Sequence, residues 1–167
     1  MKSPICGLCA SMESLCSSCQ GKVDSGEATL ADVELARALT QLAHNIPPLD
    51  KAEFKRAVSV DNVMLVTVPK GTAGQMIGRG GTFVKEISSR LGKQVKVLEE
   101  TNDHREIMQK VLFPARCLGV NVVYGARGKD GFKIRVAKTD RVKVDNPESY
   151  EKLFSQVLGK ETKISFE

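Results

Sequence analysis

Aromatic residues and long apolar runs are scarce in this chain, and each scarcity excludes a class of protein. Aromatics make up 5% of the 167 residues and tryptophan is absent. The chain therefore has too few rings for nucleic-acid binding that depends mainly on bases stacked on exposed aromatic side chains. No apolar run approaches the roughly 18 residues of a membrane span, and the start of the chain, Met1 to Cys6, lacks the apolar core of a signal peptide. We therefore expect a soluble, cytoplasmic protein without a membrane partner.

Recognisable catalytic sets are also missing. The sequence contains no carboxylate pair, no Ser/His/Asp set and no phosphate-binding loop of the G-x-x-x-x-G-K-S/T kind. The two histidines, His44 and His104, stand alone in helical contexts, where surface or capping roles outnumber catalytic ones. We expect a protein that is not an enzyme and has no small-molecule substrate. A thiol oxidoreductase using Cys6 and Cys9 is the remaining enzymatic alternative.

The charge balance favours an anionic partner without singling one out. Lysine and arginine number 25 against 20 acidic residues, which gives a formal net charge of +5 and a pI near 9.0. RNA is one such partner, although many basic proteins bind no nucleic acid. The content of 41% hydrophobic and 27% charged residues is ordinary for one or two small globular domains.

Four of the five cysteines stand at the N-terminus with metal-ligand spacing. Cys6, Cys9, Cys16 and Cys19 form the pattern C-x2-C-x6-C-x2-C, and two such pairs offer four soft ligands suited to tetrahedral zinc. A reducing compartment disfavours disulfides, so we expect one structural Zn²⁺ in a small knuckle without a complete ribbon sheet. Two disulfides, a redox pair and an iron–sulfur cluster are the alternatives. The fifth cysteine, Cys117, is predicted to be a buried, apolar-like thiol.

Hydrophobic periodicity predicts the elements that follow. The polar segment from Gln20 to Glu27 reads as a linker. A helix should begin at the capping residue Thr29, with Asp32 three residues on, and end near Asn45. The next elements are a strand from Phe54 to Val60, a strand from Val63 to Val68, a short helix from Thr72 to Ile77, a helix from Thr82 to Leu91 and a strand from Lys93 to Leu98.

A glycine-rich loop, Gly78 to Gly81, separates the two helices of this region. Glycines allow positive φ and let a phosphate approach with no Cβ in the way, so that several amide groups can converge on an anion. Arg79 adds a full charge, and the helix that Thr82 is expected to cap points its positive end at the same place. The plainer alternative is a turn that lets two helices pack closely.

The second half of the chain repeats this pattern without the loop. The predicted elements are a helix from His104 to Leu112, strands from Cys117 to Tyr124 and Phe132 to Val136 joined by a turn at Gly128 to Gly131, a helix from Glu148 to Leu158 with a core stripe from Tyr150 to Leu158, and a strand from Lys163 to Phe166. Where the loop should stand, Val144 to Glu148 has two carboxylates and no glycine. Asp145 or Asn146 is predicted to cap the helix before Pro147.

From about Leu49 to Glu167, the chain resembles the paired KH module of archaeal NusA-type transcription factors. The resemblance is carried by Val66–Gly71, Ile77–Gly81, Leu91–Lys93 and Phe113–Val120. It implies an α+β protein in which a type II KH domain precedes a degenerate KH-like repeat. The expected domains are a cysteine knuckle at 1–24, a linker and helix at 25–48, the KH domain at 49–103 and the degenerate repeat at 104–167. The cysteine knuckle and the leader helix lie outside that module.

In that family the G-x-x-G loop holds the backbone of single-stranded RNA, with bases in the adjoining apolar groove. The resemblance therefore implies an RNA-binding site at Ile77, Gly78, Arg79, Gly80, Gly81, Thr82, Lys70, Val84 and Lys85, with Ile87 as a further candidate for the groove wall. The implied function is transcription elongation or termination, on a nascent transcript and with RNA polymerase. The alternatives are a zinc and KH protein of the ribosome or ribosomal RNA, and an adaptor that docks on proteins through its knuckle.

A basic run in the second half is a candidate extension of the RNA track. It comprises Lys133, Arg135, Lys138, Arg141 and Lys143. A solvated strand face is the commoner explanation for the first two, because their spacing places them on one side of a strand.

Overall fold

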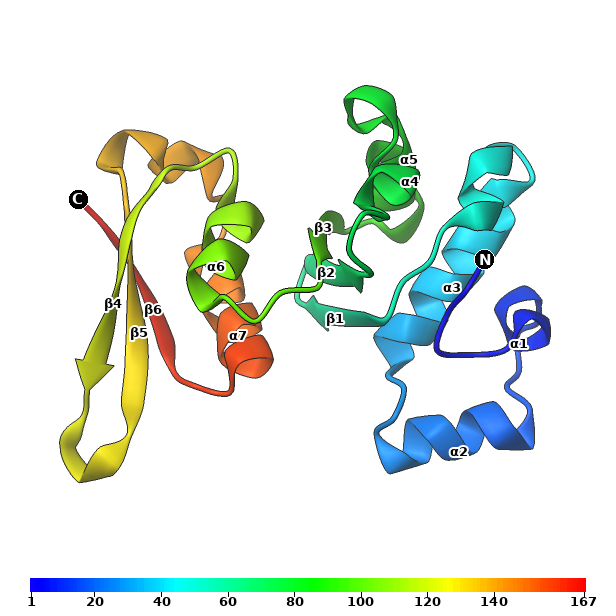
Figure 1. Cartoon of the computed structure of the whole chain (residues 1–167), viewed down its shortest axis with the longest axis horizontal. Helices are drawn as coiled ribbons and strands as arrows, with labels where there is room; N and C mark the ends of the chain where they lie inside the picture. Colours follow the sequence, from blue (N-terminus) through cyan, green and yellow to red (C-terminus); the bar gives the residue numbers. More distant parts are fainter. The chain divides into compact units, whose positions relative to one another are not determined.

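The computed structural model describes all residues from Met1 to Glu167 and divides into two compact units, Met1–Glu100 and Thr101–Glu167. Each unit contains a three-stranded sheet packed with helices (Figure 1), so the expected α+β class is confirmed. The first unit takes in the cysteine segment, the leader helix and the first sheet together. None of the helices has the length and apolar content needed to span a bilayer.

The first unit follows the predicted order of elements closely. It contains α1 (Gly7–Ser11), α2 (Ser17–Ser25), α3 (Leu30–Ala43), the 3-10 turn η1 (Pro47–Lys51), β1 (Arg56–Val60), β2 (Val63–Val68), α4 (Ala73–Ile77), η2 (Arg79–Gly81), α5 (Thr82–Leu91) and β3 (Gln94–Glu99). The central strand β2 is antiparallel to β1 and parallel to β3. Its buried apolar run and the helices α4 and α5, which connect β2 to β3, explain the continuous hydrophobic stretch seen in the sequence.

The predicted linker from Gln20 to Glu27 is wrong, because most of it belongs to α2. Cys16 occupies the N-cap of this helix, and Gly26 ends it in the left-handed conformation with φ 80°. The segment has no apolar stripe that would predict a helix, because Cys19 is the only buried residue of α2. Lys22 further ties the helix to the N-terminal segment by donating from Nζ to the carbonyl oxygen of Pro4 at 3.2 Å.

The predicted cap of α3 is confirmed and also joins the helix to the sheet. The Thr29 hydroxyl accepts from the amide of Asp32 at 3.2 Å, and the Asp32 carboxylate accepts from the amide of Thr29 at 2.7 Å. Asp32 is only 1% exposed, and its second oxygen accepts from the amide of Ala57 in β1 at 2.6 Å. The Thr29 hydroxyl donates to the carbonyl oxygen of Ala57 at 3.2 Å. The start of α3 is therefore fixed to one residue of the edge strand.

The second unit repeats the sheet topology of the first. It contains α6 (His104–Leu112), β4 (Cys117–Tyr124), η3 (Ala126–Gly128), β5 (Asp130–Val136), η4 (Lys138–Lys143), α7 (Pro147–Leu158) and β6 (Thr162–Phe166). The central strand β5 is antiparallel to β4 and parallel to β6, as β2 is to β1 and β3. Tyr150, Leu153 and Phe154 of α7 are buried, as the core stripe predicted. Val157 and Leu158, the last two residues of that stripe, are only partly buried.

Two local predictions for the second unit need correction. The turn lies earlier than Gly128 to Gly131, because β5 already begins at Asp130. Asn146 occupies the N-cap of α7, but neither it nor Asp145 makes a side-chain capping bond. Pro147 starts the helix with a preset φ and without an amide to satisfy, so less capping is required.

A buried carboxylate, Asp140, joins η4 to the start of β4. It is 2% exposed and accepts from the amide and Nε of Arg116 at 2.9 and 3.1 Å. Lys143 approaches its other oxygen at 2.8 Å. These donors, Lys143 first, hold the pKa of Asp140 well below its ordinary value.

We expect the second unit to lose stability in acid. Because the folded-state pKa of Asp140 is lowered, its carboxylate stabilises the unit above the ordinary pKa of 3.8, and this stabilisation disappears as the pH falls below that value. Both tyrosines of the chain, Tyr124 and Tyr150, lie in this unit, so tyrosine fluorescence during urea unfolding reports on it. Asp140→Asn should have a lower free energy of unfolding than the wild type at pH 7, and the difference between the two should be smaller at pH 3. If the free energy of unfolding depends on pH equally in both proteins, Asp140 does not have this role.

Candidate metal centre and glycine loop

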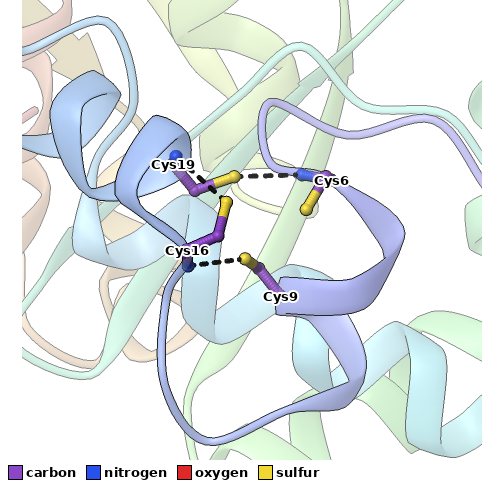
Figure 2. Close-up of side chains that lie close together, drawn as sticks. All are labelled: Cys6, Cys9, Cys16 and Cys19. Carbon is purple, nitrogen blue, oxygen red and sulfur yellow. Dashed lines mark hydrogen bonds between the residues drawn. The ribbon is translucent and has the colours of Figure 1, made fainter.

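The four N-terminal cysteines converge on one point (Figure 2). Their sulfur atoms all lie within 4.8 Å of one another, which approaches the sulfur separation of about 3.8 Å expected for a tetrahedral zinc with Zn–S bonds of 2.3 Å. All four thiols are free. The predicted ligand set is therefore brought together with a geometry that can hold a metal ion.

The two C-x2-C pairs are built in the same way. Cys6 and Cys16 occupy the N-caps of α1 and α2 and are exposed, whereas Cys9 and Cys19 lie in the first turns of those helices and are 2% exposed. Each helix start thus presents one outer and one inner sulfur to the common centre. The two short helices replace the sheet of a larger zinc ribbon, as the short spacer predicted.

Backbone amides donate to the sulfur atoms across the cluster (Figure 2). The amide of Cys16 donates to Cys9 Sγ at 3.1 Å, and that of Cys6 donates to Cys19 Sγ at 3.3 Å. A third bond, from the Cys19 amide to Cys16 Sγ, measures 3.5 Å. Such donors stabilise thiolates, which is the form that binds metals.

The thiols differ in how easily they ionise. The backbone amide of Cys19, followed by the neighbouring thiols, lowers the pKa of Cys16 to about 7. The amide of Cys9 likewise lowers the pKa of Cys6. At Cys9 the amide of Cys16 acts in the same direction, but burial and the surrounding thiols together raise the pKa to about 12. Four adjacent thiolates repel one another, so full ionisation needs a cation among them.

The cysteine segment is anchored to the rest of the first unit. Arg37 of α3 donates from Nε to the carbonyl oxygen of Cys9 at 3.3 Å and from Nη2 to that of Glu13 at 2.7 Å. Cys9 and Cys19 also belong to the core cluster that contains Leu35 and Leu39 of α3. No sequence pattern indicates Arg37, because its partners are backbone carbonyl groups of the folded cysteine segment.

The second candidate site is the loop between α4 and α5. Gly78, Gly80 and Gly81 have φ values of 73°, 64° and 78°, a region that favours glycine. A Cβ on Gly78 would meet the ring of Phe83 at 2.5 Å, whereas one on Gly80 would meet nothing within 4 Å. The loop therefore needs glycine at Gly78 to close and presents Gly80 and the exposed Arg79 outward.

The other predicted loop residues fall into two groups. Ile77 and Val84 are half-buried beside the loop, while Lys70 and Lys85 are exposed. Thr82 does not cap α5: Gly81 occupies the N-cap, and the Thr82 hydroxyl instead donates to the carbonyl oxygen of Arg79 at 3.1 Å. The φ of −62° places Thr82 inside the helix, so its side chain faces back into the loop.

Ile87 is a core residue and not part of a groove wall. Its side chain is fully buried and belongs to the core cluster of the first unit. Ile77 and Val84 beside the loop keep some exposure.

The equivalent place in the second unit has a different structure. Between β5 and α7, the 3-10 turn η4 replaces α4, and the buried Val144 precedes Asp145 and Asn146. No glycine stands there. Of the basic run, Lys143 pairs with Asp140 at 2.8 Å, Arg135 pairs with Glu167 at 2.8 Å, and Arg141 lies over the ring of Phe166 at 5.5 Å.

Comparisons with known proteins bear on the fold. No family model and no curated protein matches the chain. Among solved structures, the chain is similar to the one described as "Crystal structure of APE1850", with a TM-score of 0.52 and 27% identity over 77% of this chain and 96% of that chain. That description names no activity or partner, so the similarity supports a shared arrangement of helices and strands.

Proposed function

We propose that this chain is a non-catalytic protein that binds single-stranded RNA through the loop Gly78–Gly81. The observation that carries the proposal is the position of this loop, between two helices that connect the parallel strands β2 and β3. This order of elements resembles that of type II KH domains; in KH domains a G-x-x-G loop clamps about four nucleotides. The second unit would then be a KH-like repeat that has lost its clamp.

The chemistry of the loop suits a phosphate backbone. Arg79 is exposed and its guanidinium makes no ion pair in the structure, so its charge is available to a ligand. Gly80 leaves the loop surface open, since nothing lies within 4 Å of the position where a side chain would begin. Bases would lie along the half-buried Ile77 and Val84, and Lys70 and Lys85 would supply further positive charge.

The cysteine centre would hold one structural zinc ion. Four sulfur ligands without a water or histidine position suit a closed structural site more than a catalytic one. The cluster braces α1 and α2 against α3, so its role would be to fold the N-terminal segment of the same unit that presents the loop.

A role in transcription elongation or termination, in the cytoplasm of an archaeal cell, is the assignment that the NusA-like residues support best. It would place the chain on nascent RNA beside RNA polymerase. Association with ribosomal RNA would use the same loop, and sequencing the RNA crosslinked to the protein in cells separates the two settings.

The test is RNA affinity of the double variant Arg79→Asp, Gly80→Asp. Hydrogen bonds to charged groups are worth about 1.5–3 kcal/mol, so two new carboxylates at the phosphates should weaken binding of a short single-stranded RNA at least about tenfold. Asp is tolerated at positive φ better than most residues, which should leave the fold intact by circular dichroism. Affinity of the wild type should fall as salt rises, and that of the variant less steeply.

A charge-matched control is available on the same unit. Lys2→Asp with Ser89→Asp introduces the same change in net charge at two exposed positions away from the loop. This control should retain RNA binding. Unchanged affinity in the loop variant, or equal loss in the control, would remove the loop from the function.

An adaptor function is the second candidate, favoured by apolar side chains beside the cysteine centre. Leu8 in α1 and Met12, which directly follows that helix, are 73% and 55% exposed. Exposed apolar residues of this kind mark protein contacts when they gather in one place. In that case Leu8→Ser with Met12→Ser should abolish capture of a protein partner while RNA binding by the glycine loop persists.

A further inference from the structure

The hairpin that joins β4 to β5 projects beyond its sheet (Figure 1). The third strand, β6, pairs with β5 only from Phe132 to Val136, so the rows Val123↔Gly131 and Tyr124↔Asp130 contain two strands alone. The amide of Gly125 donates to the carbonyl oxygen of Lys129 at 3.2 Å and closes the end. We call Val122–Gly131 the hairpin tip. Its residues from Val122 to Lys129 are all exposed.

The tip carries an aromatic ring that the fold does not use. Tyr124 is 81% exposed, while Tyr150, Phe132 and Phe154 of the same unit are buried. Val122 and Val123 beside it are each 47% exposed. Only 5% of the residues in this chain are aromatic, yet the ring of Tyr124 lies at the end of the β4–β5 hairpin, where it contributes little to the core. Rings in such positions offer a flat apolar face to a partner.

The charges of the tip are unpaired and mostly positive. Arg127 and Lys129 are exposed and form no ion pair, and Asp130 is the one acidic residue of the tip. Lys133 stands two residues beyond Gly131 on β5, and like Lys129 it is exposed and unpaired. Lys129 directly precedes β5, and Lys133 lies within it. By contrast, Arg135 farther along β5 is paired with Glu167.

We propose that the hairpin tip is a second contact for single-stranded RNA, separate from the glycine loop. Tyr124 would stack on a base, while Arg127 and Lys129 neutralise adjacent phosphates. The cations and the ring together indicate the class of partner. Unpaired cations favour an anionic ligand, and an exposed aromatic ring beside them favours one whose bases can stack, which is a nucleic acid. This inference rests on the proposed function only for the class of partner, because none of its residues belongs to the loop Gly78–Gly81.

The experiment compares two RNA lengths on the full-length protein. The short probe has about four nucleotides, which fills one G-x-x-G clamp, and the long one has about 16. Tyr124→Ala should weaken binding of the long RNA at least about fivefold without changing its salt dependence. Arg127→Asn with Lys129→Gln should lower the slope of log affinity against log salt by roughly 0.7 per cation removed. Asn suits the φ of 70° at Arg127.

Controls separate this proposal from the fold and from the first site. Lys2→Gln with Lys110→Gln removes two exposed cations elsewhere and should leave the long-RNA slope unchanged. Short-RNA affinity should be the same in the tip variants as in the wild type, and tyrosine fluorescence should show intact unfolding transitions. Unchanged binding of the long RNA in both tip variants would overturn the proposal and leave the hairpin as a protein-docking ribbon.

The loop variant and the tip variants test the two proposed RNA contacts separately. If Arg79→Asp with Gly80→Asp loses the short RNA while the tip variants lose only the added affinity of the long one, both sites stand. If the loop variant changes nothing but the tip variants weaken the long RNA, the hairpin is the site and the proposed clamp is not.

Discussion

Cys19→Ser is expected to abolish zinc binding and to unfold the N-terminal part of the first unit, the largest effect that a single substitution should have in this chain. Cys19 is 2% exposed and is shared between the sulfur cluster and the hydrophobic core. Apparent binding free energies of structural zinc in small peptides are about 10–16 kcal/mol at neutral pH. Loss of that energy leaves α1 and α2 (Gly7–Ser11, Ser17–Ser25) with few apolar contacts to hold them.

The measurements are metal content and thermal unfolding followed by circular dichroism. The wild type should contain one zinc per chain and melt at a lower temperature after chelation, because binding to the folded state alone stabilises it by mass action. Cys117→Ser is the matched control: Cys117 lies in the second unit, apart from the cluster, and its replacement should leave zinc content unchanged. A metal-free wild type with the melting temperature of the chelated protein would contradict the metal centre.

The sequence predicted most of the secondary structure, because its apolar patterns match the faces that are buried. The strand Val63–Val68 and the helix His104–Leu112 have the predicted ends. Thr29 and Asp32 identified the start of α3 because the capping box requires two residues at a fixed spacing. Such signals are local, and a local signal can be read without knowing the fold.

The sequence-based predictions were wrong where a local pattern is compatible with two structures. The polar segment at Gln20 looked like a linker because α2 is held by a sulfur centre and a lysine contact, neither of which leaves an apolar stripe. Thr82 looked like a helix cap by residue type, but a glycine at positive φ took that position. The ion pair of Asp140 with Arg116 joins residues far apart in sequence, and no spacing rule finds it.

The candidate metal centre was predictable as a ligand set, whereas its supports were not. The cysteine spacing named all four ligands, which the structure brings within 4.8 Å of one another. Arg37 was missed because it binds carbonyl groups of the cysteine segment, at Cys9 and Glu13. Contacts from a side chain to a distant backbone group leave no pattern in the sequence, so only the fold reveals them.

Gly78→Ala is expected to destabilise the first unit by about 3 kcal/mol, far more than a similar change two residues away. The φ of 73° with ψ of 174° at Gly78 is a conformation that residues with a Cβ adopt only under strain, at about 1–3 kcal/mol. The new methyl group would also meet the Phe83 ring at 2.5 Å, and overpacking of this kind costs about 1–3 kcal/mol. Phe83 lies in the first turn of α5, so relief of the clash must move that helix start.

Gly80→Ala separates the role of the loop in folding from its role in binding. Gly80 has φ 64° and ψ 19°, a left-handed conformation that costs a residue with a Cβ about 1 kcal/mol, and nothing lies within 4 Å of the new methyl group. Urea unfolding followed by circular dichroism should therefore show a small loss for Gly80→Ala and a large one for Gly78→Ala. Equal losses would mean that Phe83 can turn away without cost.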